Sequence, residues 1–322
     1  MTTPRLRAGI AGLGQVGLLF DDDAKRTGVW THFSAYEELA DRYQLIAACD
    51  PDPARRRKAA DRDSCLRLHD SLDAMLAAER LDVVSLCTPP GLHLAQIDAC
   101  AGRVRAVICE KPLGGGRFEA GRQTVERCVA RGTLLAVNYY KRYDGCVPAA
   151  SERLRSGAIG ELRSATAIYA GPLEAVGSHA LDLLTFLAGP LTLLSAARRA
   201  PDRLMAVLGF GASGLACLQE TGPREDLVFE IDLIGSEGRL RILDNAARLE
   251  EFRFMPSARY EHYRELAPQP SSGAADGARF IPLFKEVAAA LSGAVAPVTS
   301  NGTTALETER LLEAIERTSG GD

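Results

Sequence analysis

The segment at residues 7–17, RAGIAGLGQVG, constrains the fold of this 322-residue chain more than any other. A short apolar run at residues 7–11 leads directly into Gly12, Gly14 and Gly17. A strand followed by GxGxxG at the start of a helix is typical of a Rossmann domain, because the glycines let the backbone approach a pyrophosphate at the helix N-terminus. An ordinary glycine turn between a strand and a helix is the alternative interpretation.

The rest of the N-terminal half repeats this alternation of short apolar runs and helical stretches. The rhythm is typical of a parallel sheet that helices cover on both faces. We expect helices that include residues 92–101 and 118–131, and six strands, at residues 7–11, 44–49, 65–68, 83–87, 107–110 and 134–138. The predicted fold class is α/β, with an N-terminal Rossmann domain built on a doubly wound parallel sheet.

The rhythm changes after residue 144. A helix at 148–156, a strand at 161–170 and a helix at 178–188 precede four strands without intervening helices, near 204–210, 214–220, 227–234 and 239–243. Such a run indicates a C-terminal α/β domain with a large, mostly antiparallel open sheet. We expect domains at 1–143 and 144–322, a loop at 268–277, and closing helices at 279–291 and 303–318, the last of which packs back on the Rossmann domain.

Asp50 ends the second predicted strand, where an acid accepts the ribose hydroxyls of the adenosine in such domains. Its alternative role is that of a helix cap. The glycine loop, Gly12 to Val16 with Leu13, Gly14 and Gln15, is expected to bind the cofactor. The basic run at residues 55–58 could hold the 2′-phosphate of NADP or form a solvated helix face. Because a carboxylate at Asp50 would repel that phosphate, NAD is the expected cofactor and NADP the alternative.

Extra residues separate the glycine loop from Asp50. The gap from Gly17 is 50 − 17 = 33 residues, where the fingerprint has about 20. The surplus lies between residues 20 and 33 and carries the only tryptophan. Ligands bind near the carboxyl ends of the strands in such sheets, so Trp30, Thr31 and His32 are candidates for lining a site, with His32 as a substrate ligand. A surface loop with Trp30 stacked on a helix is the alternative.

Composition limits the possible partners. The formal net charge of −4 lacks the basic excess that a binder of nucleic acid needs. Eight cysteines are scattered without a CxxC pair, which favours reduced thiols in a cytoplasmic protein over disulfides or metal ligands. The chain enters its first strand without room for a signal peptide, and no apolar run approaches about 18 residues. We therefore expect a cytoplasmic protein that binds neither nucleic acid, membrane nor metal.

Lys111 is the strongest candidate for chemistry, because it follows the apolar run at residues 104–109 at the carboxyl end of a predicted buried strand. A surface lysine is the alternative. Asn138, Tyr139 and Arg142 follow the sixth strand and are predicted to bind substrate for the same reason. For Arg142, a salt bridge between domains is the competing interpretation.

Several motifs together resemble the Gfo/Idh/MocA oxidoreductase family over nearly the whole chain. They occur in family order as GLGQVG (12–17), SLCTPPGLH (85–93), CEKPLG (109–114), NYYKRYD (138–144), GSHALDLLTFLAG (177–189) and GSEGRLRI (235–242). The resemblance implies the two-domain fold above, a nicotinamide cofactor and a homodimer or homotetramer. It also implies that Thr88, Pro89 and His93 flank the nicotinamide and its ribose, beside Glu110 and Lys111, and that Lys111 precedes a cis proline.

The chemistry that the resemblance implies is reversible hydride transfer at a secondary alcohol of a sugar-like small molecule. His179 would be the acid and base, since its unperturbed pKa lies near neutrality, and Lys111 would stabilise the alkoxide. Asp182, three residues along the same helix, would contact the substrate. A structural histidine beside an apolar helix is the alternative for His179. Many relatives carry an aspartate four residues before the histidine, where this chain has Ala175.

Three functions are compatible with these residues. The leading one is an NAD(P)-dependent sugar, nucleotide-linked sugar or cyclitol dehydrogenase. A glycosidase that oxidises its substrate transiently with bound NAD would share the same motifs. A dinucleotide-sensing regulator without enzymatic activity is the third, and Ala175 is the residue that favours it.

Overall fold

The computed structural model describes residues 4–270 and 279–320. It divides into two compact units, the first formed by Met1–Tyr140 with Ala278–Leu306 and the second by Lys141–Gly277 with Glu307–Asp322. Each unit has its own buried apolar core. Within the described residues, no helix has the length and apolar character that crossing a membrane requires.

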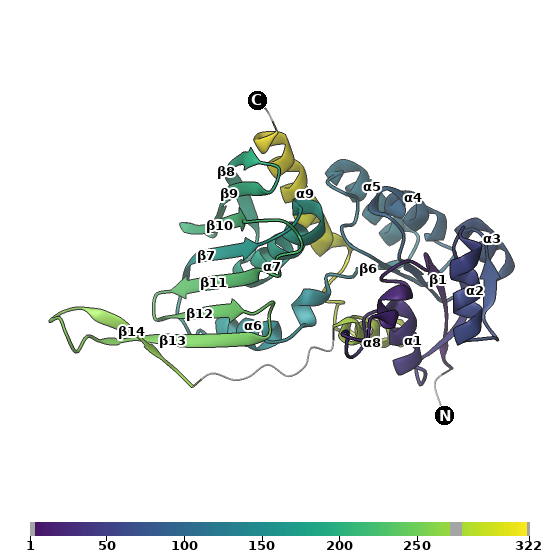
Figure 1. Ribbon diagram of the computed structural model, residues 1–322, viewed down its shortest axis with the longest axis horizontal. Helices are drawn as coiled ribbons and strands as arrows, with labels where there is room; N and C mark the ends of the chain where they lie inside the picture. Colours follow the sequence, from purple (N-terminus) through teal and green to yellow (C-terminus); the bar gives the residue numbers. More distant parts are fainter. Residues whose placement is uncertain (1–3, 271–278, 321–322) are drawn as a thin grey trace. The chain divides into compact units, whose positions relative to one another are not determined.

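The first unit is built on a six-stranded, all-parallel sheet (Figure 1). The strand order is β3-β2-β1-β4-β5-β6, which is that of the dinucleotide-binding Rossmann fold. Its strands are β1 (Leu6–Ala11), β2 (Tyr43–Cys49), β3 (Arg67–His69), β4 (Val83–Leu86), β5 (Ala106–Cys109) and β6 (Leu134–Val137). The predicted sheet is confirmed, with each strand within about two residues of its expected place.

Helices flank this sheet. They are α1 (His32–Glu38), α2 (Pro53–Arg62), α3 (Leu72–Ala78), α4 (Pro90–Cys100) and α5 (Phe118–Ala130), with a short 3-10 helix η1 (Leu19–Asp22). α3, α4 and α5 contact one another in succession, whereas α1 contacts α8 (Phe280–Leu291). The central strands β4 and β5 are buried at every position, whereas the edge strand β3 is only partly buried. This burial explains their continuous apolar sequences, which lack polar alternation.

The first unit also includes residues Ala278–Leu306, which return to it from the C-terminal part of the chain. α8 packs Phe284 edge-on against Tyr36 and Tyr43, and the Tyr43 hydroxyl donates to the Phe284 carbonyl at 2.6 Å. The next helix, α9 (Gly302–Ser319), contributes Leu306 to this core and Leu311 to that of the second unit. Contacts between residues far apart in the sequence, such as Tyr43 and Phe284 at 241 positions, therefore place α8 in the first unit.

The second unit carries an eight-stranded sheet in the order β14-β13-β12-β11-β7-β10-β9-β8, antiparallel except for the β7–β10 pair. Its strands are β7 (Leu162–Tyr169), β8 (Leu191–Ala200), β9 (Arg203–Phe210), β10 (Gly214–Glu220), β11 (Phe229–Gly235), β12 (Gly238–Leu243), β13 (Arg248–Pro256) and β14 (Arg264–Pro268). The mostly antiparallel sheet is confirmed. The sequence missed β8, β13 and β14, which lie at its two edges, and residues 271–277 of the predicted loop fall outside the described residues.

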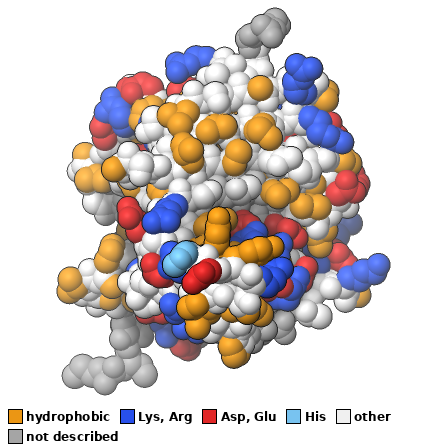
Figure 2. All heavy atoms as spheres, turned by 90° about the vertical axis from the view of Figure 1, so that its left-hand side faces the viewer, with side chains coloured by type: hydrophobic (Ala, Val, Ile, Leu, Met, Phe, Trp, Pro, Cys, Tyr) orange, Lys and Arg blue, Asp and Glu red, His pale blue; other side chains and the backbone are white. Residues whose placement is uncertain are grey.

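Helices α6 (Val147–Arg155) and α7 (Ser178–Ala188) contact this sheet, and α7 packs on β7, β8 and β10. Side chains along these strands point alternately to the two faces of the sheet, and every second side chain of β7 and β11 is buried. On the other face, the exposed side chains of Leu194 and Leu215 flank Gly209 on neighbouring strands, and Met205 is also exposed. Figure 2 shows hydrophobic side chains gathered over the upper part of one face of the molecule.

Candidate functional site

The glycine loop after β1 is shaped by close backbone contacts. Gly12 has φ of +94°, and a Cβ there would lie 2.7 Å from the Cys87 carbonyl oxygen. A Cβ on Gly17 would lie 2.0 Å from the carbonyl oxygen of Gly12 itself. Neither position accommodates a side chain, so the loop can fold back on itself only with glycine. The backbone between them is thereby left open to a ligand that approaches closely.

The insertion interrupts the helix that begins in this loop. In an uninterrupted helix, the carbonyls of Val16 and Gly17 would accept from the N–H groups of residues 20 and 21. They accept instead from His32 at 3.0 Å and Phe33 at 3.2 Å. The shift is 32 − 20 = 12 residues, so α1 continues the helix of the glycine loop and residues 20–31 are looped out of it.

Asp50 directly follows β2 and is 3% exposed. One of its carboxylate oxygens faces the glycine loop, and the other faces the turn that leads into α2. Its Oδ2 accepts from the Leu13 N–H at 2.8 Å, and its Oδ1 accepts from the Asp52 N–H at 2.9 Å. The Arg55 guanidinium lies 3.5 Å away. The cap of α2 is Asp52, not Asp50, because the Asp52 side chain accepts from the Ala54 N–H. Asp50 is thus held in place facing a cleft.

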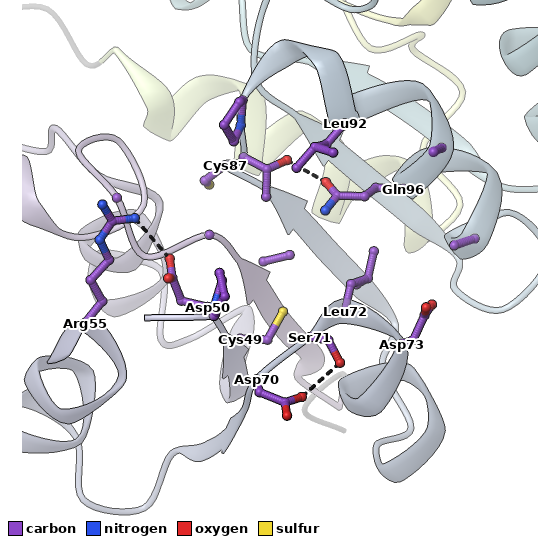
Figure 3. A pocket seen from close by; sticks show the side chains of 18 of the residues that line it. Cys49, Asp50, Arg55, Asp70, Ser71, Leu72, Asp73, Cys87, Leu92 and Gln96 are labelled. Atoms are coloured by element: carbon purple, nitrogen blue, oxygen red, sulfur yellow. Dashed lines mark hydrogen bonds and ion pairs between the residues drawn. The ribbon is translucent and has the colours of Figure 1, made fainter. Parts of the chain in front are cut away.

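This cleft has a volume of about 870 Å³ and opens at the carboxyl ends of β1, β2 and β4. Figure 3 shows Asp50, Leu72 and Gln96 pointing into it from three different elements. Besides Asp50, seven predicted cofactor residues take part in it or support it: Gly12, Gly14, Gln15, Val16, Thr88 and Pro89 line it, and Leu13 is buried. Arg55, from the basic run at residues 55–58, also lines the cleft, whereas Leu72, Leu92 and Gln96 were not predicted as lining residues. Their position just after strands β3 and β4 was the available signal.

The basic run on α2 is largely engaged within the protein. Arg56 donates to the Asp50 carbonyl at 2.6 Å, and Lys58 pairs with Asp22 of the insertion. Arg55 lies beside Asp50 and, 44% exposed, lines the cleft. Of these side chains, Arg55 is the one that is placed to meet a ligand in the cleft.

The loop after β5 contains a cis peptide bond between Lys111 and Pro112, as the family resemblance implied. Glu110 precedes it and is 8% exposed. Its Oε1 accepts from the Asn138 amide at 2.7 Å and lies 2.9 Å from His32 Nε2. Burial opposes ionisation, but the hydrogen bond and charge of His32, the Asn138 amide and the Lys111 charge together hold the pKa of Glu110 below its usual value.

Two histidines expected to touch ligands are instead fully buried. His32, placed in the sequence as a substrate ligand, has no exposed surface and contacts Ser85 and Glu110. His93 lies with Nδ1 2.9 Å from the Pro112 carbonyl oxygen and Nε2 2.8 Å from that of Thr88. Its ring therefore joins the loop after β4 to the loop after β5. Both histidines contact other groups of the protein, and neither is among the residues that line the cleft.

In the second unit, α7 has the predicted bounds, and His179 is its second residue, 5% exposed. A π-helix at Leu173–Gly177 leads into it and carries Ala175, one turn before the histidine. Such π-helical turns occur frequently at functional sites. Tyr139, in the first unit, is fully buried.

Arg142 and Asp182 form a buried ion pair within the second unit. Arg142 Nε donates to Asp182 Oδ2 at 2.8 Å and Nη2 to Oδ1 at 2.6 Å, with side chains 3% and 1% exposed. Thr308 lies 3.5 Å from the same carboxylate. This two-pronged pairing holds the two side chains together, and substrate contact by either residue stays a prediction.

Comparisons with known proteins agree with this architecture. Residues 6–139 match the family model Gfo/Idh/MocA, described as an oxidoreductase family with an NAD-binding Rossmann fold. A D-apiose dehydrogenase of Paraburkholderia graminis is 32% identical over 183 residues, which is 52% of this chain and 48% of the relative. An inositol 2-dehydrogenase of Rubrobacter xylanophilus is 31% identical over 118 residues, 36% of this chain and 33% of the relative.

The alignments thus span about half, or less, of the length of these curated relatives. Among solved structures, the WlbA dehydrogenase of Bordetella pertussis, in complex with NADH and UDP-GlcNAcA, superimposes with a TM-score of 0.79 at 24% identity. That match covers 98% of this chain and 97% of the other, so the fold of both units is shared. The glycine loop and the acid after β2 lie within the residues that match the family model, so the Rossmann region of this chain is similar to the NAD-binding Gfo/Idh/MocA oxidoreductase family.

Proposed function

We propose that this protein is an NAD(P)-dependent dehydrogenase or ketoreductase that acts on a secondary alcohol or ketone of a sugar, a nucleotide-linked sugar or a cyclitol. The observation that carries the proposal is the 870 Å³ cleft, lined by the glycine loop and Asp50, in a region of an NAD-binding oxidoreductase family. The substrate class rests on relatives named as D-apiose and inositol dehydrogenases.

The residues of the cleft fit a dinucleotide. Gly12 and Gly17 leave no space for side chains, so a pyrophosphate can approach the backbone N–H groups at the start of the helix. Asp50 can accept from ribose hydroxyls with the lone pairs that Leu13 and Asp52 leave unused. Among the described residues, the buried Asn138 Oδ1 has no hydrogen-bond partner, and it is an acceptor of the kind that an amide N–H₂ of a nicotinamide would satisfy.

A bound nicotinamide would take up or supply the hydride. In this proposal, His179 removes the alcohol proton during oxidation and returns it during reduction. Lys111, as an ammonium, stabilises the negative charge that develops on the same oxygen. Glu110 is ionised beside Lys111 and favours that ammonium.

The preference between NAD and NADP rests on Asp50 and Arg55. The Asp50 carboxylate favours the 2′-hydroxyl of NAD, whereas Arg55 is the cleft residue that could meet the 2′-phosphate of NADP. Because Arg55 already lies beside Asp50, and Lys58 is paired with Asp22, we propose NAD.

The first experiment is a titration of the purified protein with NADH and, separately, NADPH. Trp30 is the only tryptophan, so quenching of its fluorescence and energy transfer to the reduced nicotinamide report binding without ambiguity. Tighter binding of NADH is the expected result. Binding of neither dinucleotide would end the proposal.

A substrate screen with sugars and cyclitols then follows NADH formation by absorbance. Lys111→Ala and His179→Ala are expected to lose turnover while they retain NADH binding, and His262→Asn serves as a matched control on an exposed histidine of the β13–β14 hairpin. Full activity in both active-site variants would refute the assigned roles. Release of sugar from a glycoside without net NADH formation would point to the glycosidase, and NADH binding without any turnover to the regulator.

We also propose a homodimer or homotetramer that uses the open face of the second sheet. The exposed side chains of Leu194, Met205 and Leu215 lie on three adjacent strands of this face. Burying them would remove apolar surface from water. Light scattering after size exclusion should give a multiple of the 34.5 kDa chain mass, and Leu215→Glu should reduce it. A monomeric parent protein would refute the assembly.

A further inference from the structure

A cluster of polar side chains lies inside the first unit, apart from the cleft. His32 on α1, Ser85 on β4 and Asn138 after β6 have no exposed surface, and Glu110 after β5 is 8% exposed. His32 Nδ1 lies 2.9 Å from Ser85 Oγ, and Nε2 lies 2.9 Å from Glu110 Oε1. The Tyr36 hydroxyl lies 2.8 Å from the same Ser85 oxygen. Four parts of the chain that are distant in sequence thus meet in one hydrogen-bonded cluster, in which His32 and Asn138 contact the Glu110 carboxylate.

Hydrogen-bond chemistry assigns the protons in this cluster. An ionised carboxylate can only accept, so His32 Nε2 must carry the hydrogen that it shares with Glu110. In neutral histidine, Nδ1 is then an acceptor, which Ser85 satisfies by donating its hydroxyl hydrogen, while Tyr36 donates to Ser85. In this one arrangement, each hydrogen bond of the series from Tyr36 through Ser85 and His32 to Glu110 has one donor and one acceptor. The bond at Nδ1 therefore decides which nitrogen faces Glu110.

The position of His32 is also over-determined. Its backbone N–H donates to the Val16 carbonyl at 3.0 Å, across the 12 looped-out residues. Its ring lies 5.4 Å from that of Phe280 and 5.2 Å from that of Phe284, both on α8. Thr31 caps the helix by accepting from the Ser34 N–H and donates its own hydroxyl to Asp21 at 2.7 Å. The insertion and α8 together leave the imidazole no other orientation.

Glu110 adjoins Lys111 in the chain, and the Lys111 charge is among the causes that favour its ionised form. The other groups near this carboxylate are the Asn138 amide and the thiols of Cys87 and Cys109. Burial raises the pKa of the Cys87 thiol far above its usual value, so that thiol stays neutral.

We infer that His32 is a positioning residue, which holds the Glu110 carboxylate beside Lys111 and thereby keeps that lysine an ammonium. This inference rests on the proposed role of Lys111 in the reaction. His32 itself touches neither substrate nor cofactor in it. The insertion at residues 20–31 fixes the position of His32, although the side chains of the insertion need not take part in the reaction.

The test measures the protonation of Lys111 in cofactor-free protein. Brief acetylation with acetic anhydride at a series of pH values labels only neutral amines, and mass spectrometry of the peptide that contains Lys111 gives the midpoint. The exposed Lys285 serves as an internal reference in every sample. The variants are Glu110→Gln, His32→Leu, His32→Gln and Ser85→Ala.

An opposite charge within about 4–6 Å shifts a pKa by about 1–3 units, so Glu110→Gln should lower the Lys111 midpoint by about one pH unit or more. Below the midpoint, that shift means about tenfold faster labelling. His32→Leu should shift the midpoint in the same direction, and His32→Gln, which retains an N–H donor, should recover part of it. Ser85→Ala tests the same arrangement if the His32 variants fail to fold.

His69→Gln is the matched control, because His69 also faces a glutamate, Glu79, at 3.3 Å in the same unit but away from Lys111. Its Lys111 midpoint should equal that of the parent. A midpoint that moves in Glu110→Gln but stays unchanged in His32→Leu and Ser85→Ala would overturn the role of His32. Because the labelling needs neither substrate nor cofactor, this outcome is independent of whether Lys111→Ala abolishes turnover.

Discussion

The buried pair of Arg142 and Asp182 offers the sharpest test of how the second unit is held together. Asp182→Asn keeps the size and shape of the side chain but removes its charge. The guanidinium of Arg142, whose side chain is 3% exposed and lies 5.1 Å from the Phe186 ring, would then lose its ion pair with that carboxylate. Breaking one side of such a pair costs about 3–5 kcal/mol, because the remaining ion cannot recover its hydration.

The second unit has 137 + 16 = 153 residues. At about 2–4 °C for each kcal/mol in a domain of 150–250 residues, this loss corresponds to a drop in its Tm of roughly 6–20 °C. Thermal unfolding followed by circular dichroism measures it. The double variant Arg142→Met with Asp182→Leu should recover most of the stability, since an apolar pair of similar volume needs no hydration.

Glu152→Gln provides a control, because Glu152 pairs with Arg155 on α6 with both side chains largely exposed. Its Tm should be close to that of the parent. If Asp182→Asn unfolds at the parent temperature, or if the double variant is as unstable as the single one, the pair is not the source of stability described above. A raised KM at unchanged stability in Arg142→Met would restore the original hypothesis that this arginine grips the substrate.

Three further predictions concern the first unit. Asp50→Asn should weaken NADH binding by about tenfold to a hundredfold, as expected for a lost charged acceptor of about 1.5–3 kcal/mol, and calorimetric titration measures it. Gly17→Ala should abolish NADH binding and lower Tm, because its Cβ would lie 2.0 Å from the Gly12 oxygen; unchanged binding would contradict the loop geometry. Folding lowers the pKa of Glu110, so its ionised carboxylate stabilises the protein above a pH of about 4.5, and this contribution is lost as the pH falls further. The free energy of unfolding in urea should therefore change less with pH below about 4.5 in Glu110→Gln than in the parent.

Much of the fold follows from local patterns in the sequence. The glycine loop after an apolar run predicts β1 and the cofactor loop, and the bounds of α7 and β10 agree with prediction to the residue. The edge strands β8 and β14, and β13 beside β14, were missed because many of their side chains are only partly buried, so their sequences lack a clean apolar alternation. Local periodicity reports burial, and edge strands have less of it.

The candidate site likewise depends partly on local sequence and partly on tertiary contacts. The sequence by itself determined the residue types and their order: glycines 12, 14 and 17, an acid at 50, a lysine at 111 and a histidine at 179. Only the tertiary structure decided what their neighbours are. His32 reaches Glu110 across 78 positions, and Arg142 reaches Asp182 across 40, so each became an internal partner where sequence suggested a ligand contact. The physical reason is that a polar side chain far from water must find its counterpart inside the fold, and no local pattern states which distant residue that will be.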